Sequence, residues 1–76
     1  MLGDQLALVV DIKSWDVHGV AYIDLTVAYK DRSLETARLG GESIPQGLAV
    51  GEEVLVSKAM NMIVAVRRTD RDATDS

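Results

Sequence analysis

The sequence contains no cysteine and no phenylalanine, and it has a single histidine, His18. Without cysteine it can form neither a disulfide nor a thiolate zinc site, and one histidine cannot build a histidine-rich metal cluster. No apolar run approaches the ~18 residues of a membrane-spanning helix. Residues 1–4 carry no basic segment of the kind that opens a signal peptide. We therefore expect a cytoplasmic protein with no metal site and no membrane partner.

Positive charge is also scarce, because 8 Lys and Arg residues face 12 Asp and Glu residues, which gives a formal net charge of -4. An acidic chain is repelled by the phosphate backbone that dominates nucleic-acid affinity, so nucleic acid is disfavoured as a partner. The 76 residues suffice for one domain. Domains this small that lack disulfides and metals often depend on partner subunits, so we expect a homo-oligomer or a complex with another protein.

No combination of residues predicts catalysis. His18 falls in an expected turn, where polar side chains are commonly solvated. The carboxylates are spread over strands and turns, at no spacing that would pair a general acid with a general base. Gly40-Gly41 lacks the following helix and the lysine of a phosphate-binding loop. We predict that the protein is not an enzyme.

The sequence is rich in valine, isoleucine and leucine, and apolar residues make up 47% of it. Residues 5–17 and 20–30 alternate apolar with polar side chains, which is typical of half-buried strands. Shorter strands are predicted at 34–39, 54–59 and 62–67. Pro45 and Gly47 interrupt the segment 42–51, for which we predict a loop with at most one helical turn, whose Leu48 and Val50 plug one end of the core.

His18-Gly19 predicts a two-residue hairpin turn between the first two strands. The register of this turn sets Lys13 opposite Asp24, two opposite charges. A four-residue loop would instead set Asp11 opposite Asp24, and like charges directly opposite each other are unfavourable. The sequence therefore favours the two-residue turn.

Five short strands with no long helix predict an all-β fold, a small five-stranded OB-like or SH3-like barrel over residues 1–67. Closing a sheet into a barrel removes the edges that a lone sheet exposes. The tail 68–76 alternates charged with small polar residues, and we expect it to be disordered. The predicted core consists of apolar residues on one face of the strands: Leu8, Val10, Ile12, Ile23, Leu25, Val27, Val54, Val56, Val64 and Val66.

The second half of the chain carries a distinctive series of residues. The series runs through Leu34-x-x-Ala37, Ser43, the segment 47–54, Lys58-Ala59 and the segment 62–66. It resembles the TOBE domains, OB-like barrels of molybdate-binding proteins and transporter ATPases. The resemblance implies a small-oxyanion ligand such as molybdate or sulfate, held by Ser43, Lys58 and Ala59. A solvated strand lysine is the alternative interpretation of Lys58.

A second resemblance rests on part of the same region. Ile44-Pro45, Gly47-Leu48 and the segment 51–54 are also similar to the swapped-hairpin barrels of transcription regulators. The basic stretch with which that family contacts DNA is not evident here.

The hairpin register also sets Trp15 opposite Tyr22, on the face away from the predicted core. Three interpretations of this aromatic pair stay open: a local cross-strand packing pair, a subunit interface, and a stacking platform for single-stranded nucleic acid. The predicted interface residues share this outer face: Trp15, Tyr22, Val17, Val20, Val9 and Ala28. We hypothesise a non-catalytic interaction or assembly module that self-associates, with oxyanion binding and then single-stranded nucleic-acid binding as the alternatives.

Overall fold

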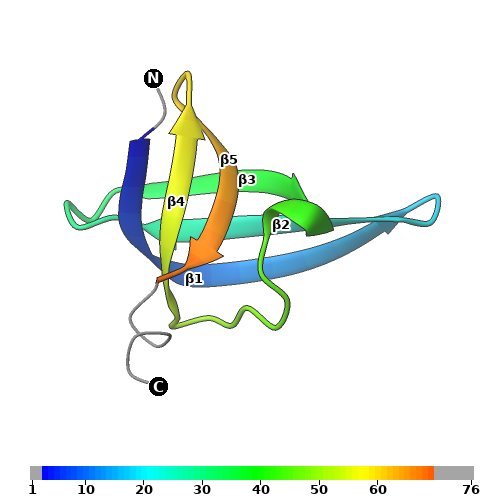
Figure 1. The fold of residues 1–76 in the computed structure, drawn as a ribbon. Helices are drawn as coiled ribbons and strands as arrows, with labels where there is room; N and C mark the ends of the chain where they lie inside the picture. The colour runs from blue at the N-terminus through cyan, green and yellow to red at the C-terminus, as the bar shows by residue number, and fades with distance from the viewer. Residues whose placement is uncertain (1–2, 70–76) are drawn as a thin grey trace.

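The computed structural model describes residues 3–69 and confirms an all-β fold (Figure 1). Five antiparallel strands form one sheet in the order β3-β2-β1-β4-β5. Their bounds are β1 Gly3–Val17, β2 Val20–Ala28, β3 Leu34–Gly40, β4 Glu53–Ala59 and β5 Met62–Arg68, with a short 3-10 turn, η1, at Gly41–Ser43. The sheet curls so that the edge strands β3 and β5 approach each other. No ladder joins these two strands within residues 3–69, so the sheet is not closed.

The first hairpin has the predicted turn and register. His18 and Gly19 both adopt positive φ, at 53° and 80°, as the favoured two-residue hairpin turn requires. Lys13 lies directly opposite Asp24, as predicted from their charges. The carboxylate of Asp16 accepts a 3.0 Å hydrogen bond from the Gly19 amide and so supports the turn.

A β-bulge in β1 changes which of its side chains face the core. Val9 pairs with Val27 and Asp11 with Thr26, so Val10 has no residue opposite. Because side chains alternate along a strand, one extra residue reverses the faces on either side of it. The placement of Leu8 and Val10 in the core is therefore wrong: Leu8 is 45% exposed and Val10 is half-buried. The placement of Val9 on the outer face is also wrong, because Val9 is 1% exposed and belongs to the core.

A second irregularity has the same consequence in β5. Ser57 pairs with Ala65 and Lys58 with Ile63, so Val64 is the extra residue. Val64 is 43% exposed and its predicted place in the core is wrong, whereas Ile63 is buried. The buried apolar core consists of Ala7, Val9, Leu25, Val27, Leu39, Ile44, Val54, Val56, Ile63 and Val66. The predicted core residues Ile12 and Ile23 pack against it while partly buried.

The segment between η1 and β4 is a loop, as predicted. Leu48 packs against the core, but Val50 is 61% exposed, so its predicted role as a core plug is wrong. Arg68 belongs to β5 instead of the tail, and its guanidinium donates to Glu52 at 2.7 Å and to the Gln46 carbonyl at 2.9 Å. Apart from Thr69, the rest of the predicted tail, residues 70–76, lies outside the described residues.

Candidate interaction surface

The β1–β2 hairpin extends beyond the rest of the sheet. The pairing of β3 with β2 ends at Gly40 opposite Tyr22, and the pairing of β4 with β1 ends at Glu53 opposite Leu8. Past Leu8 the strand β1 has lost β4, and past the Trp15–Tyr22 pair the hairpin is a two-stranded ribbon, which Figure 1 shows projecting from the other strands. We call residues 13–22 the arm and the remaining described residues the body.

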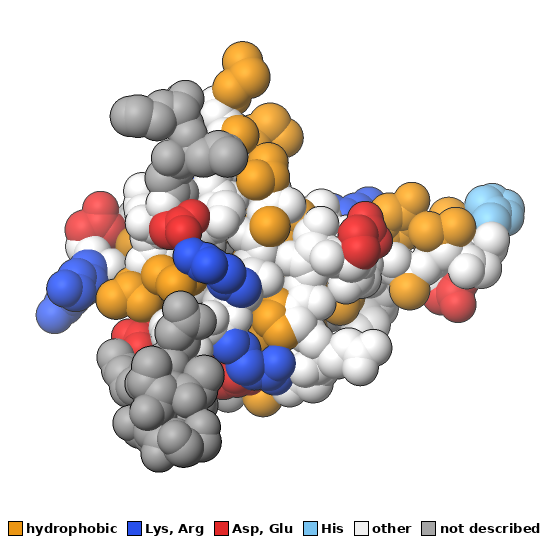
Figure 2. All heavy atoms as spheres, in the orientation of Figure 1, with side chains coloured by type: hydrophobic (Ala, Val, Ile, Leu, Met, Phe, Trp, Pro, Cys, Tyr) orange, Lys and Arg blue, Asp and Glu red, His pale blue; other side chains and the backbone are white. Residues whose placement is uncertain are grey.

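One face of the arm is apolar and exposed. Trp15, Val17 and Val20 are 47%, 48% and 50% exposed, and Tyr22 is half-buried. Trp15 lies opposite Tyr22 and Val17 opposite Val20, so the four side chains are neighbours on a single face, which we call the arm face. Figure 2 shows hydrophobic side chains along the projecting arm, next to the histidine at its tip.

A polar cluster at the base of the arm holds Trp15 in place. The Trp15 indole Nε1 donates a 2.7 Å hydrogen bond to Asp24, and Arg38 donates to both oxygens of the same carboxylate, at 2.8 and 3.1 Å. The Arg38 guanidinium also lies 5.8 Å from the centre of the Trp15 ring. The Arg38 hydrogen bonds lower the pKa of Asp24 from its ordinary value, assisted by the bond from Trp15. The indole is therefore fixed in orientation while nearly half of its surface stays exposed.

The structure separates the predicted interface residues into different places. Val9 is in the core, and Ala28 lies at the far end of β2, opposite Leu8 on one side and Leu34 on the other. Leu8 and Leu34 are 45% and 65% exposed, so they form with Ala28 a second outward apolar row, which we call the body row. The body row was not predicted from the sequence, because the expected alternation along β1 placed Leu8 in the core.

Lys58, the predicted anion-binding lysine, already has an anionic partner. Its Nζ lies 2.9 Å from Glu35 Oε1, and the Tyr29 hydroxyl donates a 2.7 Å hydrogen bond to the same oxygen. The bonds from Tyr29 and Lys58 lower the pKa of Glu35, while burial and the neighbouring Glu35 raise the pKa of Tyr29. The ion pair joins β4 to β3, two strands that are not neighbours in the sheet.

The other two residues of the predicted oxyanion site lie on different elements. Ser43 is the last residue of η1, and Ala59 ends β4, opposite Met62. An anion bound at Lys58 would have to compete with the Glu35 carboxylate. The described structure therefore offers no free positive charge at Lys58 for a tetrahedral oxyanion.

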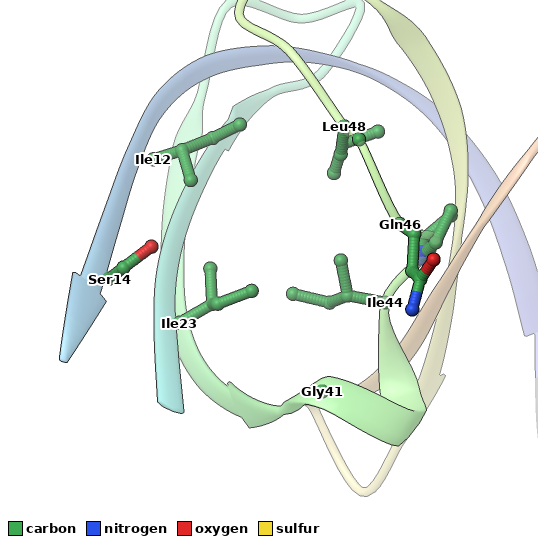
Figure 3. A pocket seen from close by; sticks show the side chains of 9 residues that line it. Ile12, Ser14, Ile23, Gly41, Ile44, Gln46 and Leu48 are labelled. Atoms are coloured by element: carbon green, nitrogen blue, oxygen red, sulfur yellow. The ribbon is translucent and has the colours of Figure 1, made fainter. Parts of the chain in front are cut away.

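A groove of about 390 Å³ lies between the hairpin and the loop that follows η1. Figure 3 shows Ile12 and Ile23 on one side and Ile44 and Leu48 on the other, with their side chains pointing toward one another. Ser14 from the arm adds a hydroxyl to the lining, and the described residues that line the groove include no charged one. The groove therefore follows the inner side of the hairpin, opposite to the arm face.

Comparisons with known proteins identify no relative: no family model, no curated protein and no solved structure matches the chain. Within the described range, no three His, Cys, Asp or Glu residues are grouped so that they could hold a metal ion. Residues 3–69 also include no helix long and apolar enough to cross a membrane.

Proposed function

We propose that this protein is a non-catalytic interaction module that self-associates through the arm face. The observation that carries the proposal is the exposure of Trp15, Val17 and Val20 on a ribbon that extends beyond the body. Burying apolar surface contributes roughly 25 cal/mol per Å², so contact between two such faces is favourable. Tryptophan and tyrosine are enriched at protein interfaces, and large exposed apolar patches commonly mark them.

The anchoring of Trp15 supports the same function. An aromatic side chain that is already fixed loses less conformational entropy when a partner covers it. The hydrogen bond to Asp24 and the Arg38 guanidinium provide this fixation at the base of the arm. Charged groups beside the apolar residues would contribute specificity more than affinity. The arm face thus combines an oriented aromatic anchor with a polar border.

The proposal extends to the finer fold and to the location. We infer a partly open OB-like barrel, a five-stranded architecture. Its support is the strand order and the Lys58–Glu35 ion pair between non-neighbouring strands. A cytoplasmic location also remains part of the proposal.

The two alternative functions have less support. Oxyanion binding depends on Lys58, whose charge is matched by Glu35. Stacking of single-stranded nucleic acid depends on Trp15, whose indole donates to the Asp24 carboxylate, an anion that repels phosphate. Self-association requires neither of these contacts to break.

The test is the solution mass of wild-type protein and two double variants, measured by sedimentation equilibrium at about 100 μM, well above the Kd of a stable subunit contact. We expect an oligomer for the wild type and a folded protein of monomer mass for Trp15→Ser with Tyr22→Ser. The matched control, Leu8→Ser with Leu34→Ser, removes two outward apolar side chains from the body row and should keep the wild-type mass. A monomeric wild type, or loss of the oligomer only in the control, would refute self-association through the arm face.

A further inference from the structure

The arm has an unpaired strand edge in addition to its apolar face. On the edge away from β2, β1 pairs with β4 from Gly3 to Leu8, and Val9 then bonds to Gly51 and Glu52. Within residues 3–69, this edge has no strand partner from Asp11 to Val17. An unpaired strand edge is a template for pairing with another chain.

The hairpin register shows which backbone groups this edge presents. In an antiparallel ladder, hydrogen-bonded and non-hydrogen-bonded pairs alternate. The pair that flanks a two-residue turn is hydrogen-bonded, so Val17, Trp15 and Lys13 bond to β2. The amides and carbonyls of Ile12, Ser14 and Asp16 consequently point away from β2, toward the unpaired edge.

We propose that the β1 edges of two copies of this chain pair antiparallel about a two-fold axis that sets Trp15 of one copy directly opposite Trp15 of the other. This inference rests on the proposed self-association and specifies its geometry. The two curled sheets would join into one through their arms. A two-stranded ribbon is marginally stable alone, whereas four paired strands stabilise one another.

Three observations limit the register to two choices. Because Gly51 and Glu52 already occupy the edge at Val9, a register centred on Ile12 or Lys13 would bring a partner strand into this occupied position. A register centred on Asp16 would set two aspartates directly opposite each other, which is unfavourable. Centring on Asp11 has both faults, and centring on Val17 would leave only the partner's turn, His18 and Gly19, opposite Asp16 and Trp15. Ser14 and Trp15 therefore remain as the residue that can lie opposite its own copy across the two-fold axis.

The side chains decide between these two registers. Centring on Ser14 sets the aspartate at position 16 opposite Ile12, which lines the apolar groove. Centring on Trp15 sets Asp16 opposite Ser14, whose hydroxyl can donate a hydrogen bond to the carboxylate. It also sets Lys13 opposite Val17, so that the aliphatic stem of the lysine can cover the valine. It also brings the two indoles together at a non-hydrogen-bonded position, where side chains approach most closely.

Disulfide trapping tests this register, because the natural chain has no cysteine and each single substitution introduces one thiol. At the proposed axis, positions 13 and 17 of opposite copies form a non-hydrogen-bonded pair with Cα atoms about 4.5 Å apart, within disulfide range. Under mild oxidation, a mixture of Lys13→Cys and Val17→Cys should give the mixed disulfide in large excess over both homodimers. Ser14→Cys alone should form little disulfide-linked dimer, and efficient crosslinking of this variant to itself would overturn the register.

Proline provides a test that does not depend on disulfide geometry. Ser14→Pro removes an amide hydrogen that faces solvent in the single chain, which a strand edge tolerates. We expect it to keep a cooperative melt and the monomer mass at about 100 μM, well above the Kd of a stable subunit contact. A folded Ser14→Pro variant that remains oligomeric, or an oligomeric wild type with no mixed disulfide, overturns the edge pairing but not self-association. A monomeric wild type overturns the proposed function itself.

Discussion

The body and the arm use the same alternating sequence pattern for different purposes. In the body, Leu25 and Val27 of β2 are completely buried, because β3 and β1 flank the strand and the curled sheet covers its inner face. In the arm, Val17 and Val20 stay half exposed, because no third strand among residues 3–69 extends that far. Apolar residues that contribute little to the core of their own chain are available to contact another molecule. The number of strands that flank a position, and not the type of residue there, therefore decides whether an apolar side chain is buried in the core or is available to a binding partner.

The largest expected difference between the two regions is in the cost of truncating an apolar side chain. Leu25→Ala leaves a cavity in the body and should lower the free energy of unfolding by about 2–5 kcal/mol. Val20→Ala removes a half-exposed side chain from the arm and should change it by about 0.5 kcal/mol or less. Urea denaturation at a concentration where the protein is monomeric measures both. Equal losses would show that the arm is packed as tightly as the body.

A smaller effect is expected at the tip of the arm, where backbone conformation alone is at stake. Gly19 has φ +80° and an added Cβ would meet nothing within 4 Å. Gly19→Ala should therefore lower the free energy of unfolding by roughly 1–2 kcal/mol, solely because alanine disfavours the left-handed conformation. Gly41→Ala is the matched control, since that position also has open space but no positive φ. If both variants melt at the same temperature, turn strain does not limit the stability of the arm.

The smallest effect concerns the pH dependence of two carboxylates. Glu35 in the body has a pKa below its ordinary value of 4.5, owing to its bonds from Tyr29 and Lys58. Its charged form stabilises the fold above about pH 4.5, and this contribution is lost as the pH falls through the lowered pKa. Glu35→Gln should therefore make the melting temperature less dependent on pH on the acid side of neutrality.

The counterpart at the base of the arm is Asp24→Asn. Asp24 also has a lowered pKa, but its partner Arg38 is 61% exposed, against 24% for Lys58, so solvent screens the interaction more. Melting temperatures between about pH 3 and pH 6, which spans the usual carboxylate range, should show the greater flattening for Glu35→Gln. If Asp24→Asn reduced the pH dependence more than Glu35→Gln, the stronger ion pair would be the one at the base of the arm.

Local chemistry made much of this fold predictable. The His18-Gly19 turn and the charges of Lys13 and Asp24 determined the hairpin register, and the structure confirms it. Alternation along β2 correctly placed Leu25 and Val27 in the core. These features depend on neighbours in sequence or on one cross-strand pair, so the sequence alone contains the needed information.

The features that the sequence did not reveal depend on the curvature of the whole sheet. Residues 6 to 10 are all apolar, so no alternation there fixes which side chains face the core, and β1 contains a bulge at Val10 where the strand passes from β4 to the arm. The bulge puts Val9 inside and Leu8 outside, and so moved one predicted interface residue into the core. The pairing of Lys58 with Glu35 likewise depends on how far the sheet curls, which no local pattern encodes.

Amide hydrogen exchange at two protein concentrations tests the central claim most directly. The amides of Ser14 and Asp16 face the unpaired edge, so they should be protected at about 100 μM, well above the Kd of a stable subunit contact, and should exchange rapidly once dilution below that Kd dissociates the oligomer. The amides of Leu25 and Val27 lie in the body and should be protected equally at both concentrations. Rapid exchange of Ser14 and Asp16 at both concentrations would contradict self-association through the arm.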